Sequence, residues 1–142
     1  EKKKELLRLL FGIIINILGV MMVVQLYMFA DDGFERQICE NVRMLSRLDP
    51  LSCFIGAVFC GVLMTVATVS YRRENMVAET VITILCVMVF MLAGFRHCIA
   101  NALMLLYYDC SHINYLAMVG GNTVGSLCYG YLYHRSRGSK NK

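Results

Sequence analysis

An arginine and a histidine lie side by side in an apolar stretch of this chain, and their side chains are the ones best suited to chemistry. Arg96 and His97 interrupt an otherwise uncharged run, Val81–Tyr108, whose composition is typical of a membrane span. An ionisable pair at bilayer depth is costly unless it faces protein or water, so such a pair usually marks a pathway. A buried imidazole there is suited to sense pH or to share a proton with a weak acid.

Each of these residues also has a plainer interpretation. A lone histidine in an apolar helix is often a packing residue with a satisfied hydrogen bond, and Phe90, seven residues earlier, reads as a core aromatic. Arg96 can extend its guanidinium to a polar cavity or pair with a carboxylate such as that of Glu79. His97 and Cys98 are adjacent and point in different directions on a helix, so they form no catalytic dyad. We therefore expect no enzyme activity.

Composition places the chain in the membrane. Its 142 residues are 58% hydrophobic and 17% charged, with one proline, and the mean hydropathy is +0.57. A water-soluble domain of this size usually has a smaller hydrophobic fraction, more charged residues and a lower mean hydropathy. The net charge of +4 could suggest nucleic acid, but the basic residues lie at the ends of apolar segments rather than in one patch with aromatics. We expect an integral protein of the lipid bilayer that binds no nucleic acid.

Four apolar segments predict a polytopic all-α membrane helix bundle, folded as a single transmembrane domain. The spans are expected at about 9–30, 51–71, 78–108 and 113–133, since roughly 20 residues cross a hydrocarbon core. The third span holds 31 residues and would reach about 46 Å as one straight helix. We expect it to be interrupted between Leu92 and His97. The fourth carries the adjacent Gly120 and Gly121, and we expect it to be broken as well.

Basic residues predict the orientation. Only Arg36, Arg43 and Arg47 lie on one side of the expected spans. The other side carries ten basic residues: Lys2, Lys3, Lys4, Arg8, Arg72, Arg73, Arg135, Arg137, Lys140 and Lys142. Because cytoplasmic loops carry an excess of Lys and Arg, we expect both ends of the chain in the cytoplasm.

The connection between the first two spans has a helical pattern of its own. Ile38, Val42 and Leu45 recur at helical spacing among charged residues, which predicts a short amphipathic helix at the membrane interface. Pro50 then fits the first turn of the next helix.

The seven cysteines form no Cys-x-x-Cys pair and lie mostly inside apolar runs. We interpret them as small core residues, although Cys39 and Cys110 fall in connections on the same side and could pair. We expect no metal site and no cofactor.

A short motif occurs in both the first and the last span. Asn16-Ile-Leu-Gly19 and Asn122-Thr-Val-Gly125 each have an Asn followed three residues later by a Gly, and the two spans run in opposite directions. This is the pattern expected of an inverted-topology repeat. The alternative is two asparagines that hydrogen-bond between helices beside small packing glycines.

One longer segment points to a family. Gly94-Phe-Arg-His-Cys-Ile-Ala-Asn101 resembles the Gly-Phe-Glu-His-Ser-Val-Ala-Asn signature of the formate/nitrite transporter family. Leu116–Gly125 is similar to the last span of that family, Phe54–Val69 to its fourth and Glu5–Gly19 to its third. The resemblance covers essentially the whole chain.

The resemblance implies a six-span, aquaporin-like inverted-repeat fold, of which this chain would supply spans three to six without the first two. It implies a homopentamer, when complete, in the inner (plasma) membrane. The implied substrates are small monovalent anions, such as formate, nitrite or hydrosulfide, together with protons.

The resemblance also implies a set of pore residues. His97 is similar to the central pore histidine, Asn122 to its polar neighbour on the last span and Phe90 to a hydrophobic constriction residue. Asn101 closes the signature. Three positions depart from the family: Arg96 stands where Glu is usual, Thr65 where the fourth span usually has Asn, and Asp49 where some members place a pore-vestibule Lys.

These residues suggest how an anion would pass. Stripping water from an anion costs more than a few hydrogen bonds return, and protonation removes that cost. His97 would exchange the proton, Asn122 would hold the ring or the anion, and Phe90 would pass the neutral acid while blocking ions. The alternative is a truncated or accessory membrane subunit with a structural role and no transport of its own.

Overall fold

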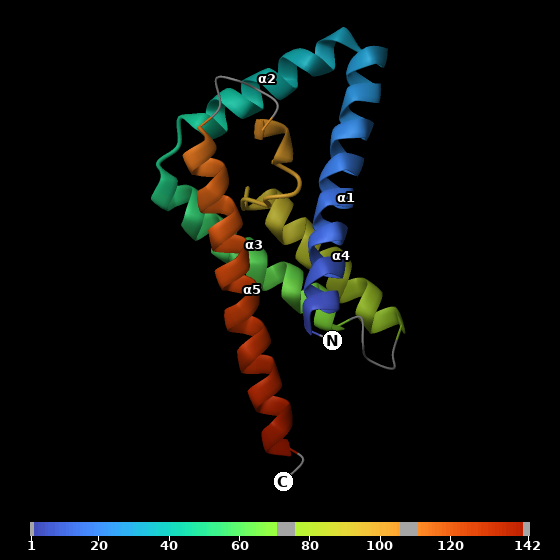
Figure 1. The fold of residues 1–142 in the computed structure, drawn as a ribbon, viewed down its shortest axis with the longest axis vertical. Coiled ribbons are helices and arrows are strands. Elements are labelled where there is room, and N and C mark those ends of the chain that lie inside the picture. The colour runs from blue at the N-terminus through green and yellow to red at the C-terminus, as the bar shows by residue number, and fades with distance from the viewer. Residues whose placement is uncertain (1, 71–75, 106–110, 141–142) are drawn as a thin grey trace. The chain divides into compact units, whose positions relative to one another are not determined.

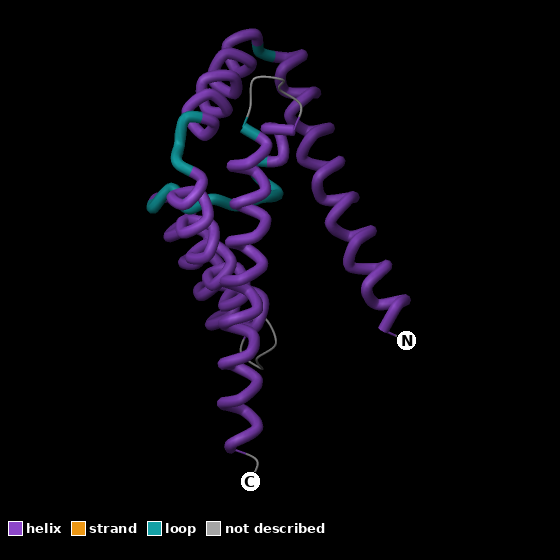
Figure 2. Tube along the Cα trace, turned by 60° about the vertical axis from the view of Figure 1, so that its left-hand side comes forward, coloured by secondary structure: helices purple, strands orange, loops and turns teal. Residues whose placement is uncertain are grey.

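The computed structural model is helical in the part of the chain that it describes, residues 2–70, 76–105 and 111–140 (Figure 1). The α-helices are α1 (Lys2–Ala30), α2 (Asp32–Ser46), α3 (Pro50–Ser70), α4 (Met76–Leu92) and α5 (His112–Lys140), with a short 3₁₀ helix, η1 (Ala102–Leu105). Short loops join α1 to α2 and α2 to α3, as Figure 2 shows in teal. The predicted all-α class is confirmed.

Two of the described helices are long and apolar enough to cross a membrane. They are Lys3–Ala30 of α1 and all of α3, whereas α4 is a shorter apolar helix. The predicted connection around Arg72 and Arg73 lies outside the described residues, as does Cys110. The arrangement of four spans therefore stays a prediction.

Contacts divide the chain into two compact units. The first contains Glu1–Leu48 and Cys98–Tyr115, and the second contains Asp49–His97 and Leu116–Lys142. Helix α5 thus contributes its first residues to one unit and the remainder to the other.

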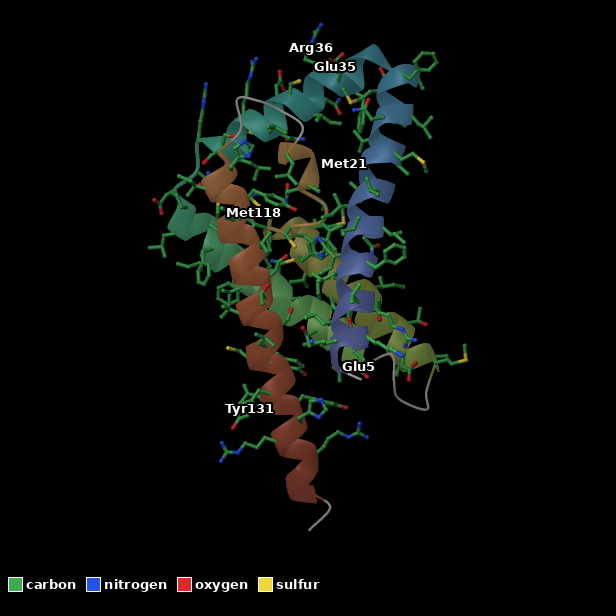
Figure 3. All side chains as sticks on the ribbon, viewed as in Figure 1. Glu5, Met21, Glu35, Arg36, Met118 and Tyr131 are labelled. Carbon is green, nitrogen blue, oxygen red and sulfur yellow. The ribbon has the colours of Figure 1, made fainter. Side chains whose placement is uncertain are left out.

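In the first unit, α2 is the predicted amphipathic helix. Ile38, Val42 and Leu45 are buried, with 6–9% of their surface exposed. Glu35 and Arg36 point away from the helix on its polar side (Figure 3). The helix begins at an N-cap, Asp31, whose Oδ1 accepts a hydrogen bond from the Gly33 N–H at 2.8 Å.

A buried asparagine closes the other end of α2. Asn114 is 1% exposed, and its Nδ2 donates to the carbonyls of Leu45, Ser46 and Leu48 at 2.9, 3.3 and 2.9 Å. The last carbonyls of a helix have no partner within it. Asn114 therefore ties α2 to the start of α5.

In the second unit, α4 ends inside the apolar stretch, as predicted. Gly94 has φ +65°, and the Phe95 N–H donates to the Phe90 carbonyl at 3.0 Å while the Gly94 N–H donates to that of Met91 at 3.2 Å. This pair of bonds around a left-handed residue is the Schellman motif that closes many helices. The predicted interruption between Leu92 and His97 is confirmed.

The prediction of a second broken span was wrong, because α5 runs unbroken through Gly120 and Gly121. These glycines serve helix packing instead. A Cβ on Gly121 would collide with the Phe54 carbonyl oxygen, and one on Gly125 would collide with that of Val58. Glycine here lets the backbones of α3 and α5 approach closely without leaving helical geometry.

The cysteines divide by position. Cys53 and Cys60 are fully buried and Cys86 is 7% exposed, which confirms the core interpretation for these three. Cys39 and Cys98 are half-buried, and Cys128 is exposed on α5, so the core interpretation is wrong for Cys128.

Gly94→Ala tests the break. Its new Cβ would meet nothing within 4 Å, so the variant isolates the left-handed backbone, which costs roughly 1–2 kcal/mol for a residue with a Cβ. We expect a lower Tm for the full-length protein in detergent. Gly130→Ala is the matched control, since Gly130 is helical, has no close neighbours and should gain stability from alanine. A Gly94→Ala protein as stable as the wild type would contradict the motif.

Gly125→Ala tests the close approach of α3 and α5. The added methyl group meets main-chain atoms of Val58, which cannot rotate away, and overpacking of this kind costs typically about 1–3 kcal/mol. Thermal unfolding should therefore shift to lower temperature. Gly120→Ala is the control within the same helix, because its Cβ would make only an ordinary contact, 3.7 Å, with the Phe54 ring. Equal decreases in Tm for Gly125→Ala and Gly120→Ala would contradict a close contact between α3 and α5 at Gly125.

Candidate functional site

The helix break of the second unit brings together most of the residues singled out from the sequence. After α4 ends, residues 95–97 follow no regular secondary structure. Their main-chain groups are therefore not committed to a helix, and in an apolar layer such groups need partners. His97 and Arg96 both lie in this short segment, and both are half-buried.

Asn122 of α5 supplies a partner. Its Nδ2 donates to the carbonyl of Arg96 at 2.8 Å and to that of Ala57 at 2.7 Å. Both hydrogens of the side-chain amide nitrogen are thereby engaged. One side chain joins the break, α3 and α5, and it fixes the main chain directly beside His97.

The aromatic residue predicted as a constriction lies beside the histidine. The Phe90 and His97 ring centroids are 5.8 Å apart with an interplanar angle of 32°. A second aromatic pair, Phe59 and Phe95, stacks with centroids 5.5 Å apart. Sequence reasoning missed Phe59, and the only signal for Phe95 was its place in the octapeptide.

Arg96 lies along α3. Its Cγ is 3.4 Å from the position that a Cβ on Gly56 would take, so glycine leaves room for the arginine side chain. The suggested pairing with Glu79 was wrong. Glu79 is 5% exposed, and its Oε1 has no hydrogen-bond partner.

The other two predicted residues have different surroundings. Thr65 donates its hydroxyl to the Gly61 carbonyl one turn earlier in α3, at 2.8 Å, and Ser126 of α5 donates to the same carbonyl at 3.2 Å. Asn101 belongs to the first unit, in the turn that leads into η1. A pore role for Thr65 and Asn101 stays a prediction.

The small residues on α3 are a part of the site that sequence reasoning missed, whereas packing by Gly125 of α5 was one of its alternatives. A Cβ on Gly61 would collide with the main chain of Asn122, so the asparagine reaches its two carbonyls only because Gly61 has no side chain. The signal was present as two small-x-x-x-small patterns, Ala57/Gly61 and Gly121/Gly125, which favour close helix crossings.

Among the described residues, no group of three or more His, Cys, Asp or Glu side chains could hold a metal ion. The donors and acceptors at the break are an imidazole, a guanidinium and main-chain carbonyls. Of these groups, the guanidinium can hold a small anion and the imidazole can exchange a proton.

The comparisons with known proteins give one match. A family model described as formate/nitrite transporter matches residues 2–135. Neither the comparison with curated proteins nor that with solved structures gave a match.

Asn122→Leu tests the bridge at the break. It keeps the size of the side chain while removing two hydrogen bonds, each with a net worth of about 1 kcal/mol, and it leaves the Arg96 carbonyl without its amide donor. We expect a clear fall in Tm for the detergent-solubilised protein. Thr123→Ala is the control, because Thr123 is exposed and bonds only to its own helix, at the Val119 carbonyl. A decrease in Tm no larger than that of Thr123→Ala would show that the Asn122 hydrogen bonds do not stabilise the protein.

Proposed function

Because the chain belongs to the formate/nitrite transporter family, we propose that it forms a pore for small monovalent anions in which His97 exchanges protons with the substrate. Proteins of this family are membrane transporters or channels built as helix bundles, and they are not enzymes. Formate, nitrite and hydrosulfide are the substrates to test first.

One observation carries the proposal. An imidazole lies within a helix break, with an aromatic ring 5.8 Å away and with the preceding carbonyl held by Asn122. A titratable group in an interrupted membrane helix is suited to a transport path, because the freed backbone is tolerated only where it lines a cavity or is buried in protein.

The proposed steps follow from solvation. The positive charge of Arg96 attracts the anion toward the break. The imidazolium of His97 gives its proton to an oxygen or sulfur of the anion, which leaves a neutral imidazole and a neutral acid. The neutral acid then passes the Phe90 ring without the cost of desolvating a charge. Release on the far side returns a proton to water, and His97 takes up another.

Asn122 has a supporting role in this scheme. Its amide nitrogen donates to the Ala57 and Arg96 carbonyls, so we assign it to the geometry of the break. A hold on the imidazole would use its side-chain oxygen, which accepts hydrogen bonds. Thr65 and Asn101 complete the proposed set of pore residues.

The arrangement in the membrane is part of the same proposal. Both ends of the chain face the cytoplasm, in accord with the excess of basic residues there, and the location is the inner (plasma) membrane. The Asn16 and Asn122 motifs belong to an inverted repeat, and five copies assemble around one axis, each with its own pore.

His97→Phe tests the proton role in liposomes that contain the full-length gene product. Wild-type uptake of formate, nitrite or hydrosulfide should rise as the external pH falls, because both the imidazolium and the neutral acid become more abundant. His97→Phe should abolish or flatten that dependence. His134→Phe is the matched control, since His134 is exposed on α5, and it should keep the wild-type profile.

Two results would contradict the proposal in different ways. A pH profile unchanged in His97→Phe would reject the proton role and leave anion passage standing. No flux of any of the three anions, in a stably assembled protein, would instead support the accessory-subunit alternative.

A further inference from the structure

The C-terminal part of α5 carries aromatic and basic residues that have no part in the helix break. Tyr131, Tyr133, Arg135 and Arg137 form what we call the collar of α5. Each arginine follows a tyrosine by four residues, and α5 is helical through Lys140. Residues four apart lie on the same face of a helix, so the collar consists of two tyrosine–arginine pairs.

In one of these pairs the two side chains are in contact. Arg137 Nη1 donates to the Tyr133 hydroxyl at 3.1 Å, and the guanidinium carbon lies 5.6 Å from the centroid of the Tyr133 ring. A guanidinium has five N–H donors, and this bond engages one of them. The tyrosine thus holds the guanidinium in place and leaves donors for a phosphate, which arginine binds through paired hydrogen bonds.

The two pairs lie on nearly opposite sides of α5, because residues two apart on an α-helix are separated by about 200°. Tyr131 is 66% exposed and projects from the helix near its C-terminal end (Figure 3). Arg135 and Arg137 are exposed as well. A protein partner bound to one face of α5 would reach one arginine, whereas a lipid surface surrounds a spanning helix and reaches both.

The length of α5 brings the collar to the level of the lipid headgroups. Its 29 residues reach roughly 43 Å, whereas the hydrocarbon core is about 30 Å thick. The predicted span covers residues 113–133, so the excess length lies at the C-terminal end. Tyrosines are enriched at the boundary between membrane and water, and the arginines follow one turn later, where the phosphates lie.

The charge of this end favours anionic lipids over zwitterionic ones. No acidic residue follows Asp109 in the sequence, whereas residues 135–142 include Arg135, Arg137, Lys140 and Lys142. Basic residues directly after a membrane span are attracted to the negative charge of anionic headgroups.

We propose that the collar of α5 binds the phosphate of an anionic phospholipid headgroup. The inference rests on the membrane location of the family and on α5 as the last predicted span, and it is independent of which anion is transported. Aromatic and basic anchors set how a helix sits in the bilayer. The bound lipid therefore fixes the depth of the helix that carries Asn122.

A tryptophan beside the collar gives a local measurement of lipid binding. The chain has no tryptophan, and Leu132 is 62% exposed, so Leu132→Trp adds a reporter at this level. The full-length protein with this change is placed in phosphatidylcholine vesicles that contain brominated phosphatidylglycerol or brominated phosphatidylcholine. Brominated phosphatidylglycerol should quench the added fluorescence more strongly, and NaCl should reduce the difference by screening.

The arginine variants test whether the collar causes this preference. Arg135→Gln and Arg137→Gln should each lower the association of phosphatidylglycerol relative to phosphatidylcholine by about fivefold, the size expected for one basic residue near an anionic surface. Arg135→Lys and Arg137→Lys keep the charge and should keep most of the preference. Arg36→Gln is the matched control, because Arg36 is an exposed arginine of α2, and it should change nothing at the reporter.

Three results would overturn the proposal. Equal quenching by the two lipids would show that the collar does not select anionic lipid, and it would leave the basic end of α5 to an acidic protein partner. A preference that persists when both arginines are glutamine would assign it to other residues, and the single variants decide this point if the double variant assembles poorly. Quenching by neither lipid would show that this end of α5 does not reach the bilayer surface. None of these measurements involves transport, so their outcome is separate from that of His97→Phe.

Discussion

A helix that stops inside an apolar layer must find partners for its last carbonyl groups, because no water is there to take them. Helix α4 meets this constraint at Gly94. The Schellman motif satisfies the carbonyls of Phe90 and Met91 from the residues that follow, and Asn122 satisfies the Arg96 carbonyl from another helix. The irregular backbone that carries His97 is stable only because these bonds are made.

The Asn122 bridge in turn sets the distance between α3 and α5. A side chain as short as asparagine reaches the Ala57 carbonyl only when the two backbones nearly touch, and Gly61, Gly121 and Gly125 make that approach possible. A polar bridge and a glycine contact thus depend on each other. Loss of the glycine contact separates the helices, and loss of the bridge leaves a carbonyl unpaired in the apolar layer.

Two charged residues of the second unit, Arg96 and Glu79, lie within or beside apolar stretches of the chain. Arg96 lies beside α3, with its Cγ 3.4 Å from the position that a Cβ on Gly56 would take. Glu79 is different. Its side chain is buried, and Oε1 has no hydrogen-bond partner. Glu79 lies on α4, and sequence reasoning had suggested that it forms an ion pair with Arg96.

The sequence by itself determined the features that depend on local chemistry. Helical spacing located the buried face of α2, Pro50 marked the start of α3, and the length of the third apolar run together with Gly94 located the break. The octapeptide around His97 identified the family. Each of these follows from residues close together in the chain, whose backbone preferences and periodicity do not need a partner.

Only the tertiary structure decided what depends on a second helix. Gly94 and Gly121 look alike in sequence, yet one takes a left-handed turn and the other stays helical against the Phe54 carbonyl. Glycine permits both outcomes, and the neighbouring backbone selects between them. In the same way, the sequence could not tell that the amide hydrogens of Asn122 go to the carbonyls of Ala57 and Arg96. These partners are 65 and 26 residues away, and only packing brings them within reach.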